Sequence, residues 1–282
     1  MATFEAQVHA LTNIGATLSA STTPTDAQLD QFLKDGVIDV TDKCLAIMPQ
    51  EIQDFQRVSA IKDSNNNFRV NGARIISVLR EANADGSSDA STAWRPCRKI
   101  PPSLESRVVD TDSLDFASIY NPAYMIADDG YVNVYPAPDG TNDGFKVYYV
   151  NNVPVDKSGA ALLHSHSDIG YFADNKVYLV VMYAAIKCLE TKMAAMHASI
   201  PTYSNSTTET DDWHFIKTAI ETEEDLELGS GRTQSLQGEM QQFVTEYQWY
   251  RDKIQSLNQQ YISAFGINRP QQEAPQEERR RR

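Results

Sequence analysis

The stretch LQGEMQQFVTEYQWYRDKIQSLNQQY, residues 236–261, decides the C-terminal part of the fold. Its apolar side chains recur alternately four and three residues apart, which is the a/d pattern of a helix with one apolar seam. The seam consists of Leu236, Met240, Phe243, Tyr247, Tyr250, Ile254, Leu257 and Tyr261. Gly238 is the only weak helix former among these residues. The spacing predicts a long helix that needs a partner along its seam.

Aromatic side chains with a polar tip are concentrated in this helix. They are Tyr247, Trp249, Tyr250 and Tyr261. Such residues favour interfaces, because they bury a large area and keep a hydrogen-bonding group. An amphipathic helix packed on its own domain has the same pattern. The seam is therefore a candidate surface for another subunit or protein, and packing within the chain is the alternative.

The rest of the chain predicts an α+β protein that is mainly helical. Thr25 and Gln28 have the spacing of a capping box, so a helix should begin there, with Gly36 bending or ending it. Asp174 should cap a second strong helix whose first half is apolar on most sides. Gly229-Ser230-Gly231 should break the charged segment before the long helix. The expected segments are an N-terminal part (1–24), an adaptor-like domain (25–200) with helices at 25–48, a β-rich region at 52–156 and a central helix at 174–198, an acidic connection (201–231), the long helix (232–265) and a flexible tail (266–282).

The β-rich region reads as short runs of Val, Ile, Tyr and Phe between turn residues. Strands are expected at 75–79, 123–126, 131–135 and 145–150, with a short helix at 104–109 after two prolines. Asp128-Asp129-Gly130 joins the second and third strands at hairpin distance. The last three strands should form a small antiparallel meander.

The composition is that of a folded globular protein with an acidic body. The 282 residues carry a formal charge of −13, and residues 267–282, with five Arg and three Glu, carry +2 of it. An acidic surface argues against binding of nucleic acid over a broad area, because such binding needs a high density of Lys and Arg. The dense basic run is Arg279, Arg280, Arg281 and Arg282, a second candidate partner-binding group.

Three widely spaced cysteines, Cys44, Cys97 and Cys188, suggest neither a disulfide framework nor a zinc site. The first residues lack the positive region of a secretory signal, and the longest apolar run, Val177–Ile186, is too short to cross a bilayer of about 30 Å. We expect a soluble protein from a reducing compartment, with no membrane association.

Two patterns could hold a metal. His164 and His166, with Asp168 nearby, place two imidazoles at alternate positions. The run from Asp139 to Gly144 resembles the start of an EF-hand loop, but the twelfth position, which needs Glu, is Val150. Incidental histidines and a hairpin turn are the simpler interpretations. No catalytic triad, phosphate loop or carboxylate pair is visible, so we expect no enzyme, no cofactor and no bound metal.

Three segments together resemble the head-to-tail adaptor (connector) proteins of tailed bacteriophages. They are LDQFLKDGVIDVTDKC (29–44), NPAYMIADDGYVNVYPAPDGTNDGFKVYYVNNVPVD (121–156) and FADNKVYLVVMYAAIKCLETKMAAM (172–196). The likeness lies in the order of an opening helix pair, a β portion and a central helix. The stretch at 82–103 and the helix after residue 230 depart from that pattern.

This resemblance implies a virion structural protein at the head–tail interface, assembled in the host cytoplasm. Copies of the chain would form a ring of twelve beneath the portal protein, extend the DNA channel and present a surface to tail or nozzle proteins. Genomic DNA would pass without sequence-specific binding, which suits an acidic body. The alternatives are another neck, head-closure or tail-completion protein and, from a different class, a metal-dependent enzyme that uses His164, His166 and Asp168.

Overall fold

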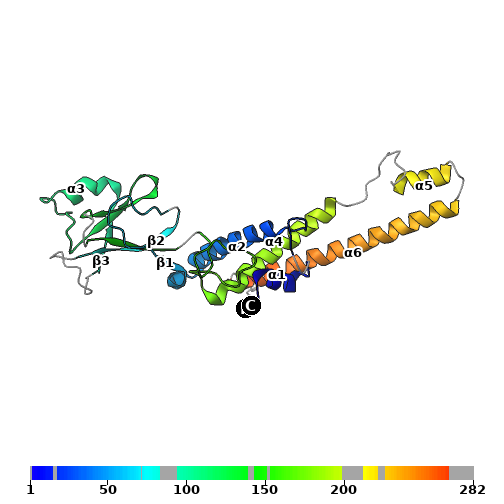
Figure 1. Ribbon diagram of the computed structural model, residues 1–282, viewed down its shortest axis with the longest axis horizontal. Helices are drawn as coiled ribbons and strands as arrows, with labels where there is room; N and C mark the ends of the chain where they lie inside the picture. The colour runs from blue at the N-terminus through cyan, green and yellow to red at the C-terminus, as the bar shows by residue number, and fades with distance from the viewer. Residues whose placement is uncertain are drawn as a thin grey trace, which may run out of the picture. The chain divides into compact units, whose positions relative to one another are not determined.

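The computed structural model shows two compact units, and the expected α+β class is confirmed (Figure 1). It describes residues 2–14, 18–70, 72–82, 94–138, 143–150, 153–198, 212–221 and 226–266. The helical unit comprises residues 1–36, 163–167 and 178–282, and the β unit comprises residues 37–162 and 168–177. None of the helices in the described ranges has the length and apolar character that crossing a membrane requires.

The helical unit is assembled from segments at both ends of the chain. It contains α1 (Phe4–Thr12), the first part of α2 (Asp26–Ile47), nearly all of α4 (Val177–Ala198), α5 (Asp212–Glu221) and α6 (Leu226–Ala264). The predicted capping box at the start of α2 is confirmed. Thr25 Oγ1 accepts from the Gln28 amide at 3.2 Å, and Gln28 Oε1 accepts from the Thr25 amide at 2.9 Å.

α2 does not end at Gly36, one of the two outcomes expected from sequence, because Gly36 lies where α2 packs closely on α4. A Cβ at this position would lie 3.1 Å from Tyr183 Cδ1 and 3.3 Å from Val180 Cγ1. Leu29 and Leu33, on the preceding turns of α2, are fully buried. A glycine here lets the two helices approach, so that packing outweighs its poor helix propensity.

The central helix begins three residues later than its expected cap. Asp174 lies in a turn of 3-10 helix, η4 (Asp174–Lys176), and its carboxylate is 3.2 Å from Lys157 Nζ instead of capping a helix. From Val177 onward the first half of α4 is buried on most sides, as predicted. Its fully buried side chains include Leu179, Val180, Ala184, Ala185 and Leu189.

The β unit contains two sheets. The first has the order β1 (Gln56–Val58), β7 (Phe145–Val150), β2 (Arg74–Glu81) and β3 (Trp94–Pro96), all antiparallel. The second has the order β4 (Arg98–Lys99), β5 (Ala123–Ile126) and β6 (Val132–Tyr135), with β4 parallel to β5. The short 3-10 helix η1 (Pro49–Phe55) precedes β1.

The two sheets pack face to face, and a short helix covers the outer side of the second. The core between the sheets contains Val78, Tyr124, Val132, Val134, Phe145 and Val147. Behind the second sheet, Ala123, Met125 and Tyr135 pack with Ile100 and Val108. The predicted helix at 104–109 is confirmed as η2 (Pro102–Leu104) followed by α3 (Glu105–Val109). The unit is thus layered as sheet, sheet and helix.

The predicted meander is wrong in one respect, because β7 does not follow β6 in the same sheet. The β5–β6 hairpin forms as expected through η3 (Asp128–Gly130), where Asp129 and Gly130 have φ of 59° and 79°. β7 instead lies between β1 and β2 in the first sheet. Alternating apolar residues indicate which face of a strand is buried but do not identify its neighbours, so the sequence pattern could not assign this pairing.

Candidate interaction surface

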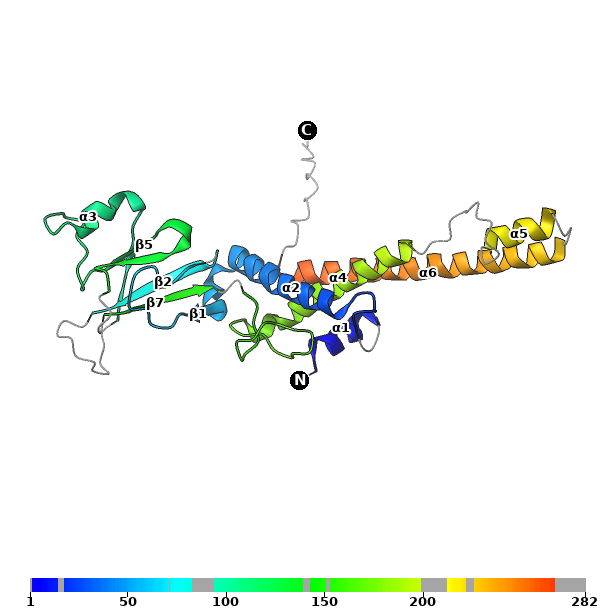
Figure 2. The same cartoon turned by 45° about the horizontal axis from the view of Figure 1, so that its top comes forward.

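The long helix α6 runs over 39 residues, from Leu226 to Ala264, and begins earlier than predicted. It continues through Gly229-Ser230-Gly231, which the sequence predicted to be a break. The cause is packing by α5: a Cβ at Gly229 would lie 2.8 Å from Ile220 Cγ1, and the neighbouring Ala219 is buried. In Figures 1 and 2, α5 folds back against the start of α6.

The C-terminal half of the seam packs within the helical unit. Tyr250, Leu257 and Tyr261 are buried, and the rings of Tyr183 on α4 and Tyr261 have centroids 6.2 Å apart. Ile254 is half-buried. Figure 2 shows α4 lying beside this part of α6. For these residues the alternative interpretation, packing on the same chain, describes the structure.

The N-terminal half of the seam is more open. α6 is about 58 Å long and α4 about 33 Å, at 1.5 Å per residue, so α4 covers only part of α6. Leu236 is buried, but Phe243 and Tyr247 are only half-buried and Met240 is 41% exposed. The Phe243 and Tyr247 rings stack on one another, with centroids 6.3 Å apart. Val244, beside the seam, is 46% exposed. This half has the apolar character of an interface and lacks full cover within the described chain.

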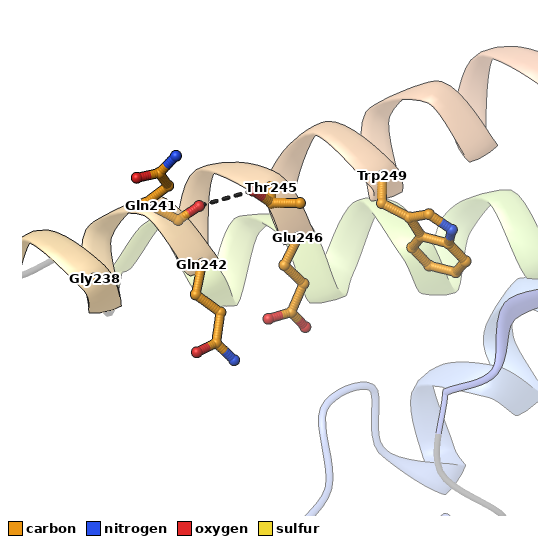
Figure 3. A pocket seen from close by; sticks show the side chains of 6 residues that line it. All are labelled: Gly238, Gln241, Gln242, Thr245, Glu246 and Trp249. Atoms are coloured by element: carbon orange, nitrogen blue, oxygen red, sulfur yellow. Dashed lines mark hydrogen bonds between the residues drawn. The ribbon is translucent and has the colours of Figure 1, made fainter.

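Another side of α6 carries a shallow, open groove that the sequence analysis missed (Figure 3). Its volume is about 670 Å³, and it is lined by Gly238, Gln241, Gln242, Thr245, Glu246 and Trp249. Figure 3 shows Gln242, Glu246 and Trp249 projecting from the same side of the helix, while the Thr245 hydroxyl donates to the Gln241 carbonyl at 2.8 Å. The signal for this face was present in the sequence: Gly231, Gly238 and Thr245 are small residues seven positions apart.

Tyr250 connects the buried seam to the edge of this groove. Burial raises the pKa of its phenol, and the neighbouring Glu246 carboxylate, which accepts from the Tyr250 hydroxyl at 3.4 Å, raises it further. The Trp249 ring, 47% exposed, meets the Tyr250 ring edge to face at 5.0 Å. The phenol is therefore neutral at physiological pH and acts as a hydrogen-bond donor, while Trp249 presents an aromatic surface to solvent.

The histidine pair has a structural setting in the helical unit. Asp30 Oδ1 accepts from the His164 amide at 2.5 Å and lies 2.9 Å from its Nδ1. The carbonyls of His166 and His164 accept from the first amides of α1, Phe4 and Glu5, at 2.8 and 3.1 Å. The segment thus ties α1 to α2. Asp168, in the β unit, accepts from the Lys157 amide at 3.4 Å. Within the ranges the structure describes, no group of three or more His, Cys, Asp or Glu side chains is placed to hold a metal ion.

The EF-hand-like run lies largely outside the described residues, which include Asp143 and Gly144 but not 139–142. Asp143 pairs with a buried cation: its Oδ2 accepts from Arg80 Nη2 at 2.8 Å. Arg80 is 2% exposed, and it also donates to the carbonyls of Pro136 at 2.9 Å and Glu81 at 2.7 Å. A buried guanidinium with this many acceptors is a structural element of the β unit.

The cysteine thiols are poor nucleophiles in this fold. Burial raises the pKa of Cys97 and of Cys188 to about 12, and it also raises the pKa of Cys44. All three are free thiols. Since the thiolate is the reactive form, these side chains act as small apolar groups in the interior.

Arg279, Arg280, Arg281 and Arg282 lie outside the described residues, so the structure places only the seam among the predicted partner-binding groups. A search of protein-family models found no family that matches this chain. A search of curated proteins likewise found no significant match.

Proposed function

We propose that this chain is a head-to-tail adaptor of a tailed bacteriophage, a structural protein of the virion neck. In this proposal twelve copies form a ring beneath the portal protein. The ring extends the DNA channel and offers a docking surface to tail or nozzle proteins. The protein has no catalytic activity and takes no cofactor, and DNA passes through the ring without sequence-specific contacts.

The order of helix, β portion and helix carries the proposal. α2 follows α1 in the helical unit, the chain then forms the β unit, and α4 packs on α2 around Gly36. The three segments that resemble adaptor proteins fall on α2, on β5 to β7 and on α4. This order of helix, β portion and helix is the order that the resemblance implies, and it supports the proposal.

Two further properties suit a ring around DNA. The open N-terminal half of the α6 seam supplies apolar surface for a neighbouring copy or for the portal, since exposed apolar patches are typical of interaction sites. The acidic body, with −15 outside residues 267–282, discourages contacts with the phosphates of a sliding duplex. The arginines at 279–282 would then meet acidic surface on the portal, through charge-assisted hydrogen bonds.

The test is binding to the portal. The full-length chain, the portal protein of the same virus and their mixture are run separately on a density gradient and analysed by mass photometry. We expect a complex in which the chain is present in multiple copies per portal ring. A folded chain that sediments apart from the portal at every concentration tried would overturn the proposal.

The same experiment separates the alternatives within the virion. A head-closure protein would bind only to a portal that already carries an adaptor, and a tail-completion protein would bind isolated tails. Elemental analysis of the purified chain tests the metal-dependent enzyme: a metal at one equivalent per chain, lost on replacing His164 by alanine, would favour it over the adaptor.

A further inference from the structure

The middle of α6 is open on two sides at the same height along the helix. One side, which we call the apolar edge, consists of Met240 and Val244, which are 41% and 46% exposed. The other, which we call the glycine face, consists of Gly231, Gly238, Gln242, Thr245 and Trp249 and contains most of the groove in Figure 3. At about 100° per residue the two sides point in nearly opposite directions.

Packing within the described chain does not require glycine at Gly231 or Gly238. A Cβ at Gly231 or at Gly238 would meet nothing within 4 Å. Each glycine in an exposed helix costs about 1 kcal/mol relative to alanine. Gly36 and Gly229, by contrast, lie where a second helix of the same chain comes close. Small residues at Gly231 and Gly238 would serve the same purpose for a helix from outside.

We propose that the glycine face of one copy receives the apolar edge of α6 from the next copy. This inference rests on the proposed ring and names the surfaces that build it. Because the two faces differ and point apart, each copy has a donor side and an acceptor side, which is the requirement for a head-to-tail contact that closes into a ring. The apolar edge lies within the turns that the glycine face covers, so the α6 helices of successive copies pack at the same level.

The charge distribution favours a second copy as the occupant. The chain carries −13 overall, so identical molecules repel each other. Between Thr233 and Trp249, however, Glu239 and Glu246 are the only charged residues, and glutamine is the most frequent polar residue. An amide side chain both donates and accepts hydrogen bonds, so glutamines on two copies can pair without a charge penalty. The contact thus falls on a part of α6 that carries few charged residues.

The size of the contact predicts how it assembles. The stretch from Thr233 to Trp249 is about 25 Å long and a helix is about 10 Å wide, which gives a few hundred Å² per partner. Stable pairs bury about 800 Å² per partner. One contact alone is therefore weak, and the ring is favoured only when all copies close it. We expect monomers and closed rings, with few dimers.

Two substitutions test the faces, and a third is the control. Val244→Glu places a charge on the apolar edge, and Gly238→Leu fills the groove from a position where a Cβ would meet nothing within 4 Å. Ile262→Glu is the matched control, because Ile262 is 48% exposed and lies eighteen residues, or five turns, further along the same side of α6. Mass photometry should show a loss of rings of at least tenfold for the first two variants and rings at wild-type levels for the control. Circular dichroism checks that all three remain helical.

Cross-linking tests the pairing directly. The double variant Gly238→Cys with Met240→Cys should give a ladder of covalent oligomers on oxidation, because each copy then carries one thiol on each face, about 3 Å apart along the helix axis. The Gly238→Cys variant alone should give neither a ladder nor dimers. Dimers from the single variant would overturn the head-to-tail arrangement.

The outcomes separate this inference from the proposed function. Rings that persist in Val244→Glu and Gly238→Leu and still bind the portal would overturn the α6 contact and leave the adaptor function standing. Wild-type rings that are broken by these variants but never bind the portal would support the contact and overturn the adaptor function.

Discussion

Replacing Leu257 by alanine tests whether the helical unit holds the C-terminal half of α6. Leu257 is 2% exposed, so the substitution leaves a cavity beside α4. Buried leucine-to-alanine changes cost about 2–5 kcal/mol, and the better helix propensity of alanine returns only a few tenths. We expect the free energy of unfolding to fall by about 3 kcal/mol, which is roughly a hundredfold in the unfolding equilibrium.

Urea denaturation followed by far-ultraviolet circular dichroism measures this effect. With a slope of about 1–3 kcal/mol per molar urea, the urea concentration at the unfolding midpoint should fall by roughly 1–3 M. Ile262→Ala, at a 48% exposed position on the same helix, should change stability by no more than about 0.5 kcal/mol. Equal shifts for the two variants would refute the packing of this half of the seam within the chain.

Three further predictions follow from buried polar groups and thiols. Asp30→Ala removes the acceptor of the His164 amide and ring nitrogen, so thermal denaturation should show a fall of about 2 kcal/mol in the free energy of unfolding. Asp30→Asn keeps an oxygen acceptor and should recover part of that stability. Arg80→Met leaves a carboxylate and two carbonyls without their donor, so the free energy of unfolding of the β unit should fall by about 3 kcal/mol. A fall below about 1 kcal/mol in near-ultraviolet melts would contradict this role of Arg80. Because burial raises the pKa of Cys97 and Cys188 to about 12, iodoacetamide should modify these thiols only after the protein unfolds. Their contribution to the free energy of unfolding should also fall as the pH rises above 9.0, because the thiols of the unfolded chain ionise there first.

The helices with local signals could be predicted from the sequence. The Thr25 and Gln28 capping box marks the start of α2, and the alternating spacing of four and three marks the seam of α6. Both signals depend on residues close together in the chain, where the helical repeat fixes which side chains meet.

Contacts between distant parts of the chain could not be predicted from the sequence. The pairing of β7 with β1 and β2, the bonds between Asp30 and His164, and the helical state of Gly229 all depend on neighbours that no local pattern specifies. Helix propensity, a local property, predicts a bend or an end at Gly36 and a break at Gly229, yet both helices continue where a second helix packs against the glycine.

The open half of the candidate surface was predicted only in part. The heptad spacing identified Met240 and Tyr247 but could not distinguish them from Leu257 and Tyr261, which are buried in the structure. That distinction depends on where α4 ends relative to α6. The spacing of Gly231, Gly238 and Thr245 was visible in the sequence, but it became meaningful only when the structure left these positions uncovered.

Electron microscopy of the purified chain mixed with the portal protein of the same virus tests the central claim most directly. The account predicts class averages in which a ring of this chain sits coaxially on the portal and shares its rotational symmetry. Portal rings that remain bare beside free, folded copies of the chain would contradict it.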